Sequence, residues 1–307
     1  MLTDDNPRQL WISEKDMYEK IGLEIRESLS VLLRENGISA VFSHRAKETD
    51  SIIKKMMRKD KRYDEILDKV GVRVVVSFKS QLSEVDSLIC KTFGGEIQKR
   101  ENMSEKLGKT EFGYQAIHYD ICKIRNGQEC ICEVQLRTIC QDGWSMLSHA
   151  IAYKTEIGIP EHIEREINAL SAVFELADNQ FQLIKSLIDE LPDTDPIRIL
   201  NYLEKFFISK IGTTYDYELS RYFLKSINTL YEDNPIMALQ KFIEVNEELV
   251  LSVIRKYSDN TFFSQPEIVL IMERLENRKY ALKEYWEQLL PVAELESIAN
   301  AWGTSIA

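Results

Sequence analysis

The stretch CICEVQLRT, residues 130–138, constrains the fold most strongly, because its polar and apolar side chains alternate with the period of a β-strand. The apolar face of such a strand holds Cys132, Val134 and Leu136, and the opposite face holds Glu133, Gln135 and Arg137. A carboxylate, an amide and a guanidinium in alternate positions suit a divalent cation, a base or ribose, and a phosphate, respectively. A half-exposed antiparallel strand with a solvated polar face shows the same alternation, so this segment alone leaves both interpretations open.

Residues 44–62 form a local concentration of positive charge, with eight Lys or Arg against three acidic residues. Thr49 or Asp50 is predicted to cap a helix here. Spacings of three and four then place Ser51, Lys54, Lys55, Arg58 and Arg62 on one face, and Ile52, Ile53, Met56 and Met57 on the opposite face. A face of hydroxyl and cationic groups, with Arg45 and Lys47 near its N-terminal end, suits a polyphosphate, the alternative being a solvated basic surface.

Two further segments, residues 68–78 and 112–124, are each predicted to form a strand entered through a glycine. Asp68 lies at the entrance of the first strand. Tyr114 lies at the start of the second strand, where it is a candidate for stacking on a base, the alternative being an aromatic of the core. The sets that share a face are Arg73, Val75 and Ser77 in the first strand, and Tyr114, Ala116, His118 and Asp120 in the second.

In their order and spacing, these four segments resemble the synthetase domain of the RelA/SpoT family, the enzymes that make guanosine tetra- and pentaphosphate. The resemblance covers about residues 40–155. The positions that match the family motifs are Arg45, Lys47, Ser51 and Lys55; Asp68, Gly71 and Arg73; Gly113, Tyr114, Gln115 and His118; Glu133, Gln135, Arg137 and Thr138; and then Trp144, His149, Tyr153 and Lys154.

The resemblance implies an α+β fold, in which a mixed β-sheet of nucleotidyltransferase type is flanked by helices and followed by an all-α region. It implies that the 3′-hydroxyl of an acceptor nucleotide attacks the β-phosphorus of ATP in the presence of Mg²⁺, and that AMP leaves. The implied roles are catalysis and metal binding for Asp68 and Glu133; ATP binding for Arg45, Lys47, Ser51, Lys55 and Arg73; and acceptor binding for Tyr114, His118, Gln135 and Arg137.

Two departures from the family pattern bear on the acceptor. Thr110 stands where many relatives have a lysine, with Lys109 one position earlier, and Ser148 stands where small relatives often have a glutamate. GDP or GTP is the expected acceptor. The alternatives are a toxin-type synthetase that modifies adenosine nucleotides or transfer RNA, in phage defence or a toxin–antitoxin pair, and a degenerate nucleotide-binding module.

Charge divides the chain into two predicted domains. Residues 1–159, the synthetase domain with an N-terminal helix over 13–37, hold 25 basic and 25 acidic side chains. Residues 160–307 hold 14 basic and 25 acidic side chains, so this half carries the whole net charge of −11. Amphipathic runs that follow a proline predict helix starts in this half, at Pro196, Pro235 and Pro266. The resulting helical region is a candidate for homo-oligomerisation, for docking a protein regulator or antitoxin, or for supporting the sheet.

Several features narrow the class of protein further. No apolar run has the length that a signal peptide or a membrane span requires, so a cytoplasmic protein is expected. Cys130-x-Cys132 lacks a second pair at zinc-site spacing, and the five cysteines are expected to be reduced. The chain has four histidines and no His-Asp dipeptide, the pair on which the hydrolase domain of long family members is built. Synthesis without hydrolysis is therefore predicted.

Overall fold

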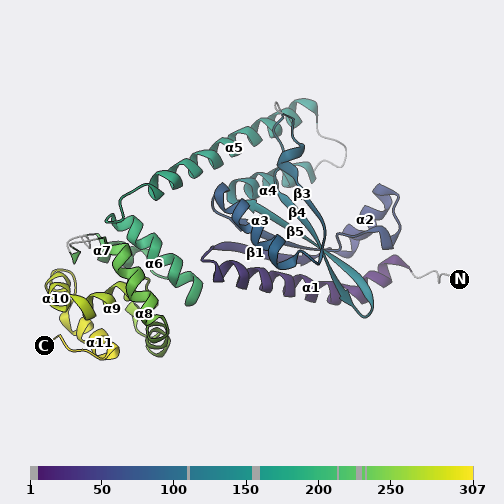
Figure 1. The fold of residues 1–307 in the computed structure, drawn as a ribbon. Helices are drawn as coiled ribbons and strands as arrows, with labels where there is room; N and C mark the ends of the chain where they lie inside the picture. Colours follow the sequence, from purple (N-terminus) through teal and green to yellow (C-terminus); the bar gives the residue numbers. More distant parts are fainter. Residues whose placement is uncertain are drawn as a thin grey trace. The chain divides into compact units, whose positions relative to one another are not determined.

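The computed structural model describes residues 6–108, 111–153, 160–212, 214–225, 230–231 and 234–306. Its elements gather into two compact units, which Figure 1 shows as a sheet with flanking helices and a separate group of helices. The first unit comprises Met1–Leu33 and Ser39–Ile184, and the second comprises Arg34–Ile38 and Lys185–Ala307.

A five-stranded sheet in the order β1-β2-β5-β4-β3 forms the centre of the first unit. β2 and β5 run parallel and the other neighbours antiparallel, so the predicted mixed sheet and α+β class are confirmed. The strands are β1 (Ala40–Ala46), β2 (Val70–Val76), β3 (Ile97–Asn102), β4 (Ile117–Arg125) and β5 (Gln128–Thr138). The strand predicted over 112–124 begins at Ile117, so Tyr114 lies in the segment that precedes it.

Helices cover the apolar face of this sheet. The helices of the first unit are α1 (Pro7–Glu35), α2 (Thr49–Lys59), α3 (Lys79–Phe93), α4 (Ile139–Tyr153) and most of α5 (Glu161–Asp189), with short 3₁₀ turns at Tyr63–Glu65 and Met103–Lys106. α1 approaches β2 so closely that a Cβ on Gly22 would lie 2.7 Å from a methyl of Val70. Tyr119 of β4 is fully buried and donates a hydrogen bond to Asp86 of α3 at 2.7 Å. The faces that alternation predicts for β5 are therefore present, with the apolar one packed against helices.

The N-terminal helix is longer than predicted. α1 begins at Pro7, whereas the sequence predicts a helix that starts at Ser13. Ser13 instead lies inside the helix and donates to the carbonyl of Leu10. Trp11 explains the extension, because its side chain is fully buried and its indole N–H donates to the Lys47 carbonyl at 3.1 Å. At the other end Gly37 adopts a positive φ of 67°, which suits glycine and agrees with the predicted end of the helix.

α2 also departs from the prediction at its ends. Glu48 occupies the N-cap position in an extended conformation without a side-chain cap, so the cap predicted at Thr49 or Asp50 is wrong. Asp50 instead pairs with Arg8 of α1, at 2.7 Å. The helix ends before Arg62, and Ile52 is its one buried residue, so the predicted basic face and apolar stripe are shorter than expected.

The second unit is a helical bundle around a buried helix. Its helices are α6 (Pro196–Lys210), α7 (Tyr217–Leu224), α8 (Pro235–Lys256), α9 (Ile268–Asn277), α10 (Lys279–Glu287) and α11 (Val292–Trp302), with a 3₁₀ turn at Thr261–Ser264. α6 and α8 begin at the predicted prolines, Pro196 and Pro235. The third helix, α9, begins at Ile268, two residues after the predicted start at Pro266. α9 is buried along most of its length. In the described part of the chain, no helix has the length and apolar character that crossing a bilayer requires.

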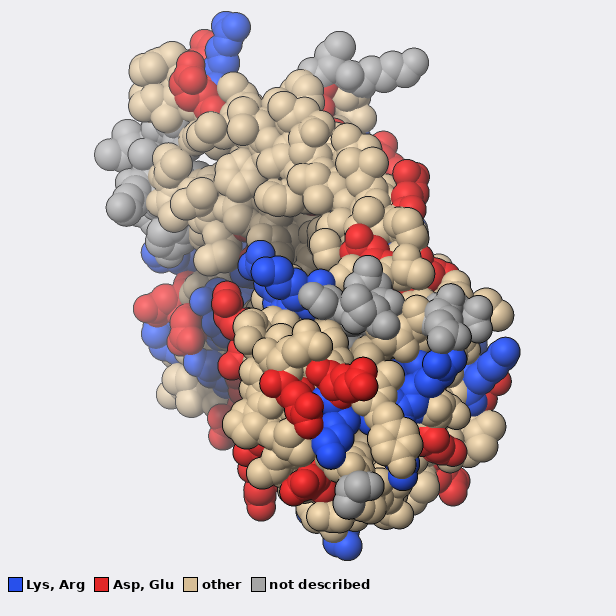
Figure 2. Space-filling view, turned by 90° about the vertical axis from the view of Figure 1, so that its left-hand side faces the viewer, with Lys and Arg blue, Asp and Glu red and all other residues tan. Residues whose placement is uncertain are grey.

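On the face drawn in Figure 2, acidic and basic side chains of the described residues are interspersed, and no single acidic patch covers this face. Such a mixture of both signs is typical of a solvated surface.

The division between the units falls after Ile184, further along the chain than the boundary predicted after residue 159. The physical reason is that α5 is bonded to the sheet unit. Thr138, at the end of β5, donates to Asp178 at 2.8 Å, and the Trp144 indole of α4 donates to the carbonyl of Ile167 at 3.2 Å.

Candidate functional site

A pocket of about 400 Å³ opens on the polar face of β1, β2 and β5. The register of the sheet creates it, because Gly71 of β2 pairs with Arg45 on one side and with Glu133 on the other. Six of the eleven predicted site residues line it, namely Arg45, Lys47, Asp68, Arg73, Glu133 and Gln135. Segments far apart in the sequence therefore place their predicted ATP-binding and catalytic side chains around one cavity.

Asp68 organises the cationic side of this pocket. Its Oδ2 accepts hydrogen bonds from Nζ of Lys47, which follows β1, and from Nζ of Lys55 on α2. Burial by itself would raise the pKa of Asp68, but the two lysines outweigh burial and lower it. Burial lowers the pKa of Lys47, an effect that Asp68 partly offsets. Two ammonium groups around one carboxylate leave an excess positive charge that suits phosphate oxygens.

The predicted acceptor residues form a closed ring of hydrogen bonds with Glu133. Tyr114 Oη lies 2.8 Å from His118 Nε2, and His118 Nδ1 lies 3.0 Å from Glu133 Oε1. Gln135 Nε2 donates to Glu133 Oε2 at 2.6 Å, and Arg137 Nη2 donates to Gln135 Oε1 at 2.6 Å and also to Tyr114 Oη. Because an ionised carboxylate only accepts, His118 Nδ1 carries a proton in this arrangement. This ring joins β4, β5 and the segment before β4.

Electrostatics distinguish Glu133 from its cross-strand neighbour Asp120. Burial would raise the pKa of Glu133, but the hydrogen bonds and charge of His118, with Gln135, outweigh burial and lower it. Burial, followed by the charge of Glu133, raises the pKa of Asp120. Of the two carboxylates, Glu133 is therefore the one whose surroundings favour the ionised form, which can accept a proton or bind a cation.

Asp142 is a site residue that sequence reasoning missed. Its Oδ1 lies 3.2 Å from Arg73 Nε and accepts from Arg137 Nη1 at 3.2 Å, so one carboxylate orients two predicted nucleotide-binding arginines. Its position in the sequence could have indicated this role, because Asp142 lies in the first turn of α4, shortly after the Glu-x-Gln-x-Arg-Thr motif of β5.

The remaining predicted residues lie at the margin of the site or outside the described chain. Ser51 is exposed on α2 and does not line the pocket, whereas Lys55 reaches Asp68 from the next turn of the same helix. Ser148 donates to the carbonyl of Ser145 within α4. The departure at Lys109 and Thr110, and the motif residue Lys154, fall outside the described residues.

The two carboxylates suit a magnesium ion. Asp68 and Glu133 both line the pocket, and the charge of Asp68 acts on the pKa of Glu133. Mg²⁺ prefers oxygen ligands and is commonly held by one or two carboxylates together with substrate phosphates and water. Over the residues that the structure describes, no cluster of three or more His, Cys, Asp or Glu could form a metal cage by itself. These two carboxylates thus fit a metal ion whose remaining ligands are nucleotide phosphates and water.

Comparison with known proteins agrees with this geometry. Residues 44–158 match the region found in RelA and SpoT proteins. We call this matched segment the RelA/SpoT region. The resemblance predicted from the motifs is confirmed, and so is the expected enzyme class, a pyrophosphotransferase. The RelA/SpoT region contains all eleven predicted site residues, although their individual roles stay predictions.

Two curated relatives from Bacillus subtilis (strain 168) cover about half of this chain. The GTP pyrophosphokinase YwaC is 28% identical over 155 residues, which are 47% of this chain and 73% of YwaC. The GTP pyrophosphokinase YjbM is 24% identical over 154 residues, which are 48% of this chain and 72% of YjbM.

Solved structures of small alarmone synthetases share the fold. Small alarmone synthetase 2 from Bacillus subtilis has a TM-score of 0.50 and 25% identity, covering 57% of this chain and 98% of its own. Small alarmone synthetase 1 from the same organism has a TM-score of 0.51 and 18% identity, covering 61% of this chain and 100% of its own. Each match leaves more than a third of this chain uncovered.

Proposed function

We propose that this chain transfers the β,γ-pyrophosphate of ATP to the 3′-hydroxyl of GDP or GTP, and thus makes guanosine tetra- or pentaphosphate. The observation that carries the proposal is the position of Glu133, which lines the pocket of the lysine–Asp68 cluster and belongs to the hydrogen-bonded ring of acceptor residues. The similarity to two GTP pyrophosphokinases supports the choice of acceptor.

The ATP side of the reaction uses the cationic wall of the pocket. In the proposed complex, Lys47 and Lys55 turn from Asp68 to the phosphate oxygens, and the planar guanidinium groups of Arg45 and Arg73 flank the adenine. Asp68 and Glu133 would hold Mg²⁺, which when bound supplies positive charge against the triphosphate. Most of the catalysis then comes from positioning and from charge neutralisation, as is general for phosphoryl-group transfer.

The acceptor side presents the attacking hydroxyl to Glu133. The bond from the acceptor 3′-oxygen to the β-phosphorus forms, the bond from the β-phosphorus to the α–β bridging oxygen breaks, and AMP leaves. The proton of the hydroxyl passes to a carboxylate oxygen of Glu133, whose orientation His118 and Gln135 maintain. Tyr114 would stack on the acceptor base, and Arg137 would contact ribose or phosphate.

The direct test supplies γ-labelled ATP and magnesium with GDP, GTP, ADP, ATP or bulk transfer RNA in separate reactions, resolved by thin-layer chromatography. Label in guanosine tetra- or pentaphosphate is the expected result. Label confined to adenosine products or transfer RNA would refute the guanosine acceptor and indicate a toxin-type synthetase. No transfer to any acceptor by folded protein would refute the proposed activity and favour a nucleotide-binding module.

The same assay tests the proposal that the chain synthesises without hydrolysing. This proposal is supported by the sequence, which has four histidines and no His-Asp dipeptide. Labelled guanosine tetraphosphate, incubated with the protein and manganese or magnesium, should remain intact. Release of labelled pyrophosphate would contradict the proposal.

We also propose that the chain self-associates through α4 and α5. α5 exposes apolar side chains to solvent, all at least half exposed: Leu170, Val173, Leu176, Phe181, Leu183 and Ile184. α4 adds Met146 and Leu147, with exposures of 56% and 58%. An apolar surface of this extent on two helices is typical of an interface. Sedimentation velocity should show an oligomer that Leu176→Glu dissociates, and a monomeric wild type would contradict the proposal.

A further inference from the structure

α5 turns a row of polar side chains toward the sheet and its neighbouring segments, although the whole of this helix follows the RelA/SpoT region at residues 44–158. Spacings of three and four residues place four contacts on one side of the helix. The row consists of Ser171, Glu175, Asp178 and Gln182, which bond to Gly113, Gln115, Thr138 and Ser80, respectively.

Two of these bonds lie on either side of Tyr114. Ser171 Oγ donates to the carbonyl of Gly113 at 3.0 Å, and Gln115 Nε2 donates to Glu175 Oε2 at 2.6 Å. Residues 111–116 lie in neither a helix nor a strand, so no ladder of backbone hydrogen bonds holds this segment over its length. Backbone bonds hold its two ends, from the N–H of Met103 to the Ala116 carbonyl and from the N–H of Glu111 to the Gly108 carbonyl. Between these ends, the bonds from α5 restrain the residues on either side of the tyrosine.

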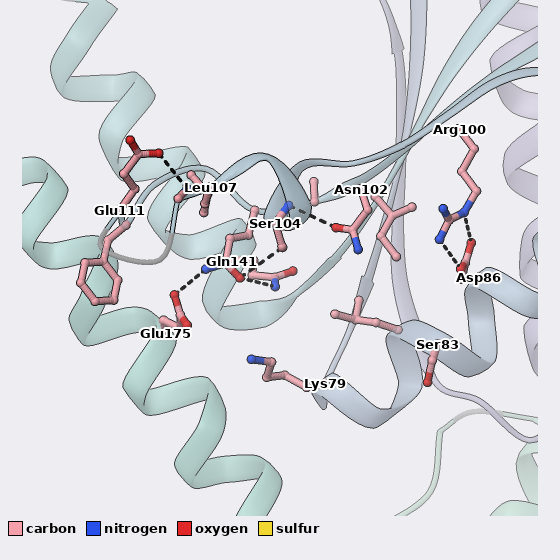
Figure 3. A pocket seen from close by; sticks show the side chains of 16 residues that line it. Lys79, Ser83, Asp86, Arg100, Asn102, Ser104, Leu107, Glu111, Gln141 and Glu175 are labelled. Atoms are coloured by element: carbon pink, nitrogen blue, oxygen red, sulfur yellow. Dashed lines mark hydrogen bonds and ion pairs between the residues drawn. The ribbon is translucent and has the colours of Figure 1, made fainter.

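Figure 3 shows the surroundings of the second bond, where Glu175 and Gln141 meet at one wall of a pocket of about 590 Å³. Gln115 Oε1 accepts from Gln141 Nε2 at 3.3 Å and from Ser104 Oγ at 3.5 Å, both longer than the bond to Glu175. The short bond to a carboxylate is thus the strongest restraint on the Gln115 side chain.

The third member of the row acts on the strand that carries Arg137. Asp178 is buried, and its Oδ2 accepts a hydrogen bond from the hydroxyl of Thr138, the residue directly after Arg137. The same hydroxyl accepts a hydrogen bond from the backbone N–H of Gln141 at the start of α4. The other carboxylate oxygen of Asp178 has no hydrogen-bond partner within the described residues. A half-satisfied buried carboxylate costs stability, which is consistent with a role in positioning the strand end.

We propose that Ser171 and Glu175 are positioning residues, which hold the segment Gly113–Gln115 so that Tyr114 is set for the acceptor nucleotide. The proposal rests on the proposed function for its kinetic consequence. Tyr114 contacts His118 and Arg137, so its displacement disturbs the acceptor ring. The cluster of Asp68 with Lys47 and Lys55 has no member on α5, so binding of ATP should be spared.

The kinetic test compares Ser171→Ala and Glu175→Ala with wild type. Each should raise the KM for GDP by about five- to tenfold, the effect of one lost bond to a buried or charged partner, and leave the KM for ATP unchanged. Glu175→Gln should restore the wild-type value, because its amide oxygen accepts the same bond. Glu166→Gln, at an exposed position of the same helix, is the matched control. Equal changes in both KM values, or no change in either, would overturn the proposal.

A second measurement does not depend on activity. Hydrogen exchange of a peptide that spans residues 111–117 should be faster in Ser171→Ala and Glu175→Ala than in wild type or Glu166→Gln. Faster exchange in a protein that transfers no pyrophosphate would refute the proposed function and leave the positioning role intact. Unchanged exchange in an active enzyme would refute the positioning role alone. Should Glu175→Ala fail to fold, Ser171→Ala, which removes one hydroxyl, carries the test.

Discussion

Replacement of Glu133 by glutamine separates the chemical role of this residue from its structural role. The two side chains have the same shape, so packing on β5 is retained. Glu133 accepts one bond from His118 at 3.0 Å and one from Gln135 at 2.6 Å. A glutamine amide has one acceptor oxygen and one donor nitrogen, so it can replace only one of these bonds without rearrangement of its neighbours.

The structural cost of Glu133→Gln is therefore one hydrogen bond, roughly 1.5–3 kcal/mol for a partner that was charged. For a unit of this size, such a loss lowers the melting temperature by about 3–12 °C. The catalytic cost is larger, because the variant loses the proton acceptor and one carboxylate of the metal site. Loss of a general base alone lowers the rate by about 10²–10⁴-fold.

The assay measures initial rates of pyrophosphate transfer to GDP and thermal melting in the same buffer. Glu129→Gln is the matched control, since Glu129 is exposed on the same strand. A folded Glu133→Gln variant that keeps more than about a tenth of the wild-type rate would refute the assigned role. If Glu129→Gln lost the rate to the same extent, the loss would come from disruption of strand β5 and not from the Glu133 carboxylate.

Three further predictions follow from individual contacts. The contacts of His118 lower the pKa of Glu133, so His118→Ala should shift the acid limb of the rate–pH profile to higher pH. Initial rates measured across the acid range test this, and an unshifted limb would contradict it. Glu267, fully buried in the second unit, has its pKa raised by burial to about 7, with a hydrogen bond from Ser220 opposing. Because the pKa of Glu267 is higher in the folded than in the unfolded state, the fold loses stability as the pH rises from the unfolded-state pKa toward about 7. Glu267→Gln removes this loss, so it should raise the melting temperature more at about pH 8 than at about pH 5. Equal changes in melting temperature at the two pH values would exclude this linkage. Gly22→Ala should destabilise the first unit by about 1–3 kcal/mol in chemical denaturation, because the added methyl would lie 2.7 Å from Val70, and a neutral result would show that α1 shifts freely.

Sequence patterns predicted the site well where the information is local. The alternation in β5 predicted the buried and polar faces of that strand, and Cys132, Val134 and Leu136 are each fully buried. The side chains on the opposite face do meet at the pocket or in the acceptor ring. Proline before an amphipathic run correctly marked the starts of α6 and α8, because proline fixes the backbone angle and needs no helical donor at that position.

One local signal was missed, and one site residue depends on a distant contact. Asn6 and Pro7 mark the start of α1, because the Asn6 side chain accepts from the N–H of Arg8 and proline occupies the first helical position. The burial of Trp11 against the Lys47 carbonyl then holds this turn in place. By contrast, Asp142 becomes part of the site only because β2 and β5 pair in parallel, which brings Arg73 within its reach.

The sequence by itself determined which side chains are available on each strand and helix face, because periodicity is a property of one continuous segment. Only the tertiary structure decided which of these faces meet. The polar row of α5 bonds to the residues on either side of Tyr114, while apolar side chains of the same helix, such as Leu176 and Phe181, are more than half exposed. The physical reason is that such contacts depend on the packing of elements some 60 residues apart, and no local pattern encodes that packing.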